Sequence, residues 1–185
     1  MRLHKLLTVR LEQSNDRRTK EHRNHRQSRR KIQIDGVDYQ NSAAFEYDIP
    51  MIGAGVSNYQ EIGKCKLVDW DGSIGGIDIH MTYKLDTTKT YYTVDVTLTN
   101  TNPVPKTNVY FYKTFDPDNN QPIGWSFMTT NTIEYQPSPF CPKALVSAVQ
   151  TSGWTSYVGL GAIDANTKVS WGGFSVPSGS DIYNG

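Results

Sequence analysis

Asp and Asn at alternate positions form the most suggestive local motif in the chain. Asp116, Asp118 and Asn120 lie in the run Asp-Pro-Asp-Asn-Asn, and oxygen ligands with this spacing open the calcium loop of EF-hand proteins. The second half of that loop is missing, because Gln121 replaces its glycine and Phe127 replaces its bidentate glutamate. We therefore favour a plain turn, in which Asp and Asn accept backbone N–H groups. A calcium site completed by distant oxygens is the alternative.

Aromatic side chains offer a second kind of chemistry, the stacking of flat rings on sugars. Tyr110 and Tyr112 share one face of a predicted strand, and Trp125 follows them in the chain. Such rings stack on the C–H faces of a sugar while neighbouring amides and carboxylates bind its hydroxyls. Burial or a subunit contact explains the same residues and is the interpretation we favour, because large β domains bury aromatic rings routinely.

Side chains suited to catalysis are sparse beyond residue 31. His80 is the single histidine there, and no serine or cysteine has the Gly-x-Ser-x-Gly context of an activated nucleophile. Acid pairs such as Asp69 with Asp71 would serve a sugar-active enzyme if they faced a cleft. Cys65 and Cys141 lack the spacing of zinc or redox sites, which leaves one disulfide or two thiols as alternatives. We predict a protein that is not an enzyme and needs no cofactor.

Charge is divided unevenly along the chain. The 185 residues are 37% apolar and 20% charged, with a net charge of +1. Residues 1–31 hold eleven Lys and Arg against three acids, a net charge of +8. Residues 32–185 hold eight Lys and fifteen acids, a net charge of −7, and no arginine. This division predicts a basic arm at 1–31 joined to a mildly acidic body at 32–185.

The arm suits a polyanionic partner. Residues 12–31 contain no apolar side chain, so by themselves they are expected to be disordered or a solvated helix. Guanidinium groups pair with phosphates through two parallel hydrogen bonds, which favours binding to nucleic acid or a neighbouring subunit. A solubilising tail or a mitochondrial transit segment is the alternative. The arginines concerned are Arg17, Arg18, Arg23, Arg26, Arg29 and Arg30.

The body shows the alternation of an antiparallel β protein. Residues 77–85 alternate strictly between apolar and polar side chains, and 91–99 repeat the pattern after a turn at 86–89, which predicts a hairpin. No window has a sustained helical period, so little helix is expected. Further strands are expected at 64–70, 108–115, 126–134, 144–149, 157–163 and 168–174.

About eight short strands in the body predict two packed antiparallel sheets, a β-sandwich of jelly-roll or immunoglobulin-like topology. No stretch is long and apolar enough to predict a membrane span, and the N-terminus lacks the apolar core of a secretory signal. The chain ends without a closing strand, which is consistent with a fragment of a longer protein.

A resemblance to known proteins lies in residues 82–174. The runs Val96-Thr-Leu-Thr-Asn-Thr101, Val158-Gly-Leu-Gly-Ala-Ile-Asp164 and Val169-Ser-Trp-Gly-Gly-Phe174 resemble β-sandwich modules of large bacterial and viral surface proteins. An arginine arm ahead of a β-sandwich is similar to small viral coat proteins, whose arms engage the genome or neighbouring subunits. The resemblance implies a structural or adhesive role and carries over no active residues.

Three hypotheses on function follow from these features. The leading one is a structural protein of a virion or cell surface, which assembles with copies of itself or with neighbouring proteins and binds nucleic acid or a subunit through its arm. The alternative is a carbohydrate-binding, adhesive β-sandwich module, with or without calcium. The third is a sugar-active β-sandwich enzyme.

Overall fold

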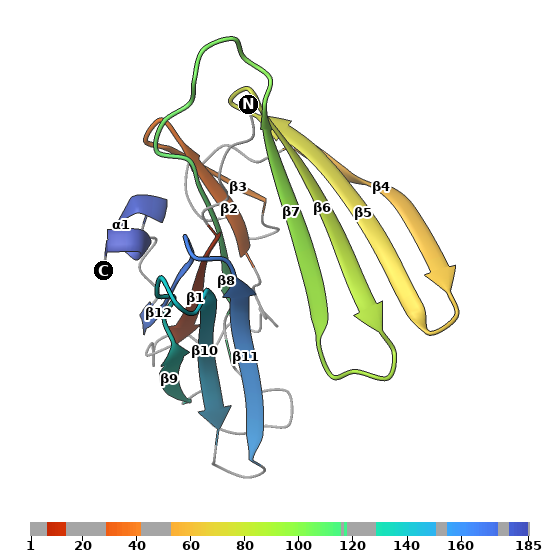
Figure 1. The fold of residues 1–185 in the computed structure, drawn as a ribbon, viewed down its shortest axis with the longest axis vertical. Helices are drawn as coiled ribbons and strands as arrows, with labels where there is room; N and C mark the ends of the chain where they lie inside the picture. The colour runs from red at the N-terminus through yellow and green to blue at the C-terminus, as the bar shows by residue number, and fades with distance from the viewer. Residues whose placement is uncertain are drawn as a thin grey trace, which may run out of the picture.

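The structure, a computed structural model, describes residues 7–13, 29–41, 53–115, 117, 129–150, 155–173 and 178–184. Within these residues the chain is all-β with one short helix, as predicted (Figure 1). The elements are β1 (Leu7–Gln13), β2 (Arg29–Ile34), β3 (Val37–Asn41), β4 (Gly53–Ile62), β5 (Cys65–Ile74), β6 (Ile77–Asp86), β7 (Tyr92–Asn100), β8 (Tyr110–Phe115), β9 (Thr130–Tyr135), β10 (Lys143–Gln150), β11 (Ser156–Ile163), β12 (Lys168–Gly173) and α1 (Gly179–Asn184).

The described strands form three sheets. One, which we call the hairpin sheet, has the order β4-β5-β6-β7 and is antiparallel throughout. A second antiparallel sheet has the order β11-β10-β9. The third, which we call the central sheet, has the order β12-β1-β8-β2-β3. In it β1 runs parallel to β8 and to β12, while β2 is antiparallel to both of its neighbours.

The hairpin predicted from alternation is confirmed by β6 and β7. Leu85 lies opposite Tyr92 at the turn, and Ile77 lies opposite Asn100 at the other end. A two-residue turn, Gly75–Gly76, joins β5 to β6 with positive φ angles of 58° and 78°. Glycine adopts this conformation without steric cost, and it matches the twist of a tight hairpin.

Both smaller sheets pack on the central sheet. The first core cluster joins the hairpin sheet to β2 and β8, and the second joins β10 to β12. Phe111 belongs to the first cluster and Phe115 lies against the second. Because these two residues share the same face of β8, both clusters cover one face of the central sheet. The first cluster consists of Ile32, Ile34, Trp70, Ile77, Ile79, Met81, Val96, Leu98 and Phe111.

The opposite face of the central sheet meets the C-terminal helix. The rings of Tyr110 on β8 and Tyr183 on α1 lie 5.7 Å apart, and the backbone N–H of Ser180 donates to the amide oxygen of Gln33 at 3.1 Å. In Figure 1 the helix lies beside the central sheet, away from the hairpin sheet. The central sheet is therefore packed on both faces.

The boundary that the charge pattern predicts at residue 31 falls inside β2. Arg29 and Arg30 pair with Thr114 and Lys113 of β8. Residues 7–13, which the charge pattern also places in the arm, form β1 between β8 and β12. Two segments of the predicted arm thus contribute strands to the central sheet.

Asp35 ties the turn between β2 and β3 to the segment that precedes β8. Its carboxylate accepts the backbone N–H of Thr107 at 2.8 Å and the ammonium of Lys106 at 2.9 Å. These two donors, the Thr107 N–H first, hold the pKa of Asp35 below its ordinary value. The charged carboxylate therefore stabilises the fold at pH values above the pKa that it has in the unfolded chain.

Substituting Asp35→Asn is expected to make the stability of the protein depend less on pH between neutral and acidic pH. In the wild type, the contribution of Asp35 is complete at neutral pH and is lost as the pH falls through the lowered pKa of the folded state. The amide keeps the shape and tolerates the positive φ of 51° at this position, but it does not titrate. Thermal unfolding followed by circular dichroism from neutral to acidic pH measures the difference, and parallel curves for the two proteins would contradict it.

Candidate functional site

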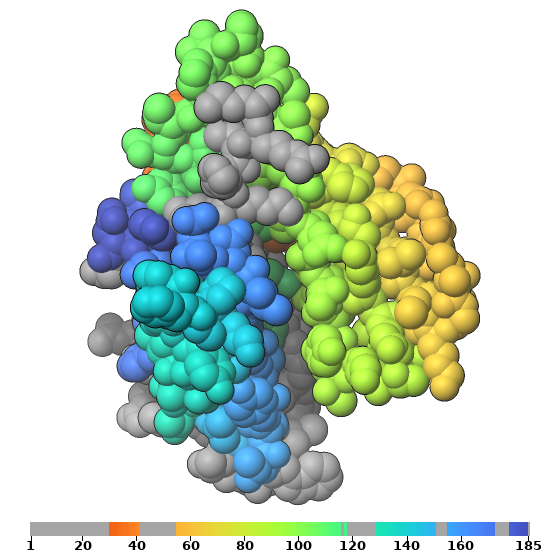
Figure 2. Space-filling view, in the orientation of Figure 1, coloured from red at the N-terminus to blue at the C-terminus, as the bar shows by residue number. Residues whose placement is uncertain are grey.

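A groove of about 460 Å³ opens between the hairpin sheet and the central sheet. In Figure 2 the lower end of the hairpin sheet stands clear of β10 and β11, whereas its upper end is packed against the rest of the molecule. Six of the nine side chains that line the groove are aromatic or cationic, and the other three are aliphatic. The lining consists of Arg30, Val56, Tyr59, Lys66, Val68, Trp70, Tyr83, Leu85 and Tyr92.

Strand register explains why these residues meet. Tyr83 of β6 lies opposite Val68 of β5, which in turn lies opposite Tyr59 of β4, so the three share one face of the hairpin sheet. Nearer the turn between β5 and β6 the same face is buried in the first core cluster. Toward the other end it loses that cover, and Tyr59 and Tyr92 remain 54% and 51% exposed.

Arg30 reaches the groove from β2 on the central sheet. Its guanidinium carbon lies 5.1 Å from the centre of the Tyr83 ring and 5.9 Å from that of Trp70, both within cation–π range. Trp70 is nearly buried and forms the floor. Burial raises the pKa of Tyr83, and the nearby Arg30 charge opposes that shift in part. The ring thus keeps its proton at neutral pH.

Lys113 of β8 borders the groove beside Tyr92. Its ammonium donates to the Tyr92 hydroxyl at 2.7 Å and lies 5.0 Å from the centre of the same ring. The rings of Tyr92 and Tyr83 are 6.2 Å apart, so Lys113 and Arg30 flank one pair of aromatic side chains.

The carboxylate of Glu61, beside Lys66 and Tyr59 of the lining, is already engaged. It accepts the ammonium of Lys66 at 2.8 Å and the hydroxyl of Tyr59. These two donors, Lys66 first, lower the pKa of Glu61, so the group is an anion at neutral pH. Arg30 and Lys113 differ from Lys66, because neither is paired with a carboxylate among the described side chains.

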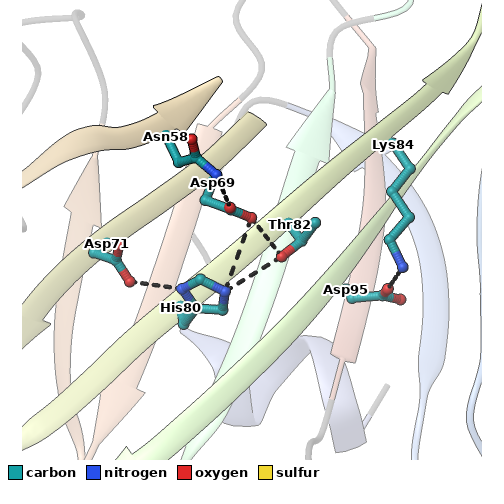
Figure 3. Close-up of polar contacts among 7 residues, drawn as sticks. All are labelled: Asn58, Asp69, Asp71, His80, Thr82, Lys84 and Asp95. Carbon is teal, nitrogen blue, oxygen red and sulfur yellow. Dashed lines mark hydrogen bonds and ion pairs between the residues drawn. The ribbon is translucent and has the colours of Figure 1, made fainter. Parts of the chain in front are cut away.

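The outer face of the hairpin sheet carries a polar network (Figure 3). Nδ1 of His80 lies 2.6 Å from Asp71, and Asp69 accepts the hydroxyl of Thr82 at 2.7 Å and the amide of Asn58 at 3.1 Å. The hydrogen bond from Thr82 is the main cause that lowers the pKa of Asp69, and a hydrogen bond from Ser57 does the same for Asp71. Glycoside hydrolysis needs a carboxylic acid with a raised pKa, which this pair does not supply.

The predicted polyanion-binding arginines are only partly described. Arg17, Arg18, Arg23 and Arg26 lie outside the described residues. Arg29 occupies the first position of β2, and Arg30 stacks on aromatic rings of the groove. The structure therefore brings one arginine of the predicted set to the candidate site.

The predicted sugar-stacking residues do not meet at the groove. Tyr112 is 1% exposed, and its hydroxyl donates to Asp38 at 3.1 Å on the face of the central sheet opposite the groove. Tyr110 is half-buried against Tyr183. Trp125 lies outside the described residues. Tyr110 and Tyr112 thus have packing roles, the interpretation that the sequence favours for them.

The predicted calcium ligands Asp116, Asp118 and Asn120 also lie outside the described residues. Among the side chains that the structure describes, no three His, Cys, Asp or Glu residues are grouped to hold a metal ion. Cys65 and Cys141 are both exposed free thiols. In the same described ranges, no helix has the length and apolar character needed to cross a membrane.

Comparison of the chain with family models, with curated proteins and with solved structures finds no match. Inference about function therefore starts from the groove and its side chains. Its aromatic residues carry a signal in the sequence: Tyr83 and Tyr92 are inward positions of the predicted hairpin. The charge pattern singles out Arg30 but does not indicate its place opposite Lys113, because that depends on pairing with a distant strand.

Proposed function

We propose that this protein binds carbohydrate through the groove between its hairpin and central sheets, as a non-enzymatic, adhesive module on a β-sandwich scaffold at a cell or virion surface. The observation that carries the proposal is the combination of four aromatic side chains with Arg30 in a concavity of about 460 Å³. Pockets of roughly 300–1,000 Å³ with a few fixed polar groups are typical of small-ligand sites.

Exposure of the rings supports stacking on a sugar. Tyr59 and Tyr92 stand half-exposed at the edge of the groove, and Tyr83 lies deeper beside Trp70. A sugar ring placed on Tyr92 would cover apolar surface that water now contacts, which is favourable in proportion to the area. The hydroxyls of the tyrosines and the guanidinium of Arg30 supply hydrogen bonds at the same place.

A structural role in assembly is the second candidate, and a different observation favours it. Ile62 and Tyr91 of the hairpin sheet region, neither of which lines the groove, are 61% and 62% exposed. Exposed apolar surface of this kind marks contacts with other proteins, here a neighbouring copy or another surface protein. On this alternative the basic arm, with Arg17 to Arg30, would bind nucleic acid or an adjacent subunit.

Substituting Tyr92→Ala is expected to weaken glycan binding by roughly ten- to a hundredfold, the effect of losing the burial of one aromatic side chain. Tyr91→Ala is the matched control, because Tyr91 is the neighbouring tyrosine, is exposed and does not line the groove. A glycan array identifies the ligand, and titration calorimetry measures its affinity for the three proteins. Adding a chelator to the same titration tests the calcium prediction.

Absence of binding to every glycan on the array would overturn the carbohydrate proposal. Light scattering on the same samples at low and high salt then decides on assembly: oligomers of the wild type that Ile62→Asp dissociates would favour the second candidate. Equal glycan affinity of Tyr92→Ala and the wild type would remove the groove as the binding site.

A further inference from the structure

Two cations face each other across β2 and β8 beside the groove. Arg30 and Lys113 are direct register partners on the face of the central sheet that carries Ile32 and Phe111. Both side chains are half-buried. Like charges directly opposite each other on neighbouring strands destabilise a sheet, and partial burial strengthens their repulsion. Such a pair calls for a compensating anion.

The described part of the chain does not supply that anion. Neither Arg30 nor Lys113 forms an ion pair with a described residue, and Lys113 donates instead to the uncharged hydroxyl of Tyr92. The carboxylate of Glu61 is bound by Lys66 and Tyr59. Counting the described side chains, the groove therefore carries net positive charge on the side of the central sheet.

The arrangement of Arg30 defines the chemistry of the missing partner. Its guanidinium lies over the rings of Tyr83 and Trp70, so these rings cover one side of the cation and hold it in place. The N–H groups at the edge of a guanidinium pair with the two oxygens of a carboxylate or sulfate in a fixed fork. The ammonium of Lys113 adds a second donor from the neighbouring strand.

We propose that the groove is specific for an acidic oligosaccharide, whose carboxylate or sulfate lies between Arg30 and Lys113 while its sugar rings stack on Tyr92 and Tyr59. This inference rests on the proposed carbohydrate function and names the class of sugar. Single-stranded nucleic acid combines the same two chemistries, but its binding sites need a basic groove that follows the backbone over several nucleotides. Here the cations without a carboxylate among the described side chains come from the central sheet alone, because Lys66 on the hairpin sheet is paired with Glu61. Lys84, paired with Asp95, lies on the outer face (Figure 3).

Three ligands of matched length test the proposal by titration calorimetry: an oligogalacturonate, a sulfated galactose oligosaccharide and the neutral galactose oligosaccharide. The acidic sugars are expected to bind at least about tenfold more tightly than the neutral one, the effect of a charge-assisted hydrogen bond, and to lose that advantage at high salt. Comparison of the first two ligands shows whether the anion is a carboxylate or a sulfate.

Lys113→Gln is expected to remove most of the preference for acidic sugars, about tenfold, while binding of the neutral sugar persists. Arg30→Gln is expected to remove the same preference and also to weaken binding of the neutral sugar, because Arg30 lines the groove and donates to sugar hydroxyls as well. Lys84→Gln is the control that removes one exposed cation from the opposite face and is expected to change nothing. Arg30→Lys keeps the charge without the fork and is expected to retain part of the preference. Circular dichroism on each variant establishes that it is folded.

Equal affinity for acidic and neutral sugars, unchanged in Arg30→Gln and Lys113→Gln, would overturn the anion subsite and leave the carbohydrate function standing. Absence of binding to every sugar would overturn the carbohydrate function itself. Tighter binding of a single-stranded oligonucleotide of equal charge, weakened by the same two substitutions, would assign the groove to nucleic acid and also overturn the proposal.

Discussion

Replacing Trp70 by alanine is expected to lower the free energy of unfolding by about 3–5 kcal/mol, the range for truncating a buried aromatic side chain. Trp70 is 7% exposed, belongs to the core cluster between the two sheets, and forms the floor of the groove beneath Arg30. The substitution removes the contacts of Trp70 with the core and the ring on which Arg30 lies. The free energy of unfolding and the affinity for the ligand should therefore fall together. Chemical denaturation followed by circular dichroism measures the first effect.

Trp171 provides the matched control for that experiment. It is the same residue type on β12 but is 49% exposed, so its truncation removes much less packing. Trp171→Ala is expected to cost clearly less than Trp70→Ala and to leave binding at the groove unchanged. Equal losses at the two tryptophans would contradict the assignment of Trp70 to the core.

Strands with strict alternation could be predicted from the sequence because one of their faces is buried. On β6, Ile77, Ile79 and Met81 are at most 1% exposed while Asp78 and His80 face solvent, as the pattern indicates. This local signal needs no knowledge of the partner strand. It therefore placed the hairpin and most of the later strands near their observed positions.

Other strands were missed for identifiable reasons. Asp35–Gly36 is a two-residue turn between β2 and β3, with φ angles of 51° and 83°, and Asp-Gly is a strong hairpin signal. The charges that precede it led instead to the prediction of a basic arm. β1 pairs in parallel with β8 and β12, which are far from it in sequence, so no local pattern could reveal it.

The groove could not be predicted from the sequence, because it forms where the central sheet no longer covers the inner face of the hairpin sheet. Tyr83 and Met81 have equivalent inward positions on β6, yet Met81 is buried in the core whereas Tyr83 lines the groove. That difference is set by how far β2 and β8 extend across the hairpin sheet. The same long-range pairing brings Arg30 beside Lys113, so the charge on the groove wall is a property of the folded chain.

Glycine on β11 shows how closely two strands approach in the third sheet. A Cβ added at Gly161 would lie 2.6 Å from the backbone oxygen of Ala144 on β10, closer than real Cβ contacts allow. At Gly159, on the same face, the nearest atom would be the end of the Leu145 side chain at 3.3 Å. The first contact involves backbone in a paired strand and cannot relax by rotation of a side chain.

Gly161→Ala is therefore expected to destabilise the protein by about 1–3 kcal/mol, the usual cost of overpacking, because β10 and β11 must separate locally. Gly159→Ala is expected to be close to neutral, since Leu145 can turn away and alanine loses less backbone entropy on folding than glycine. Chemical denaturation of both variants measures the difference. If both substitutions had the same effect, the close approach of Gly161 to Ala144 would not be what requires glycine on this strand.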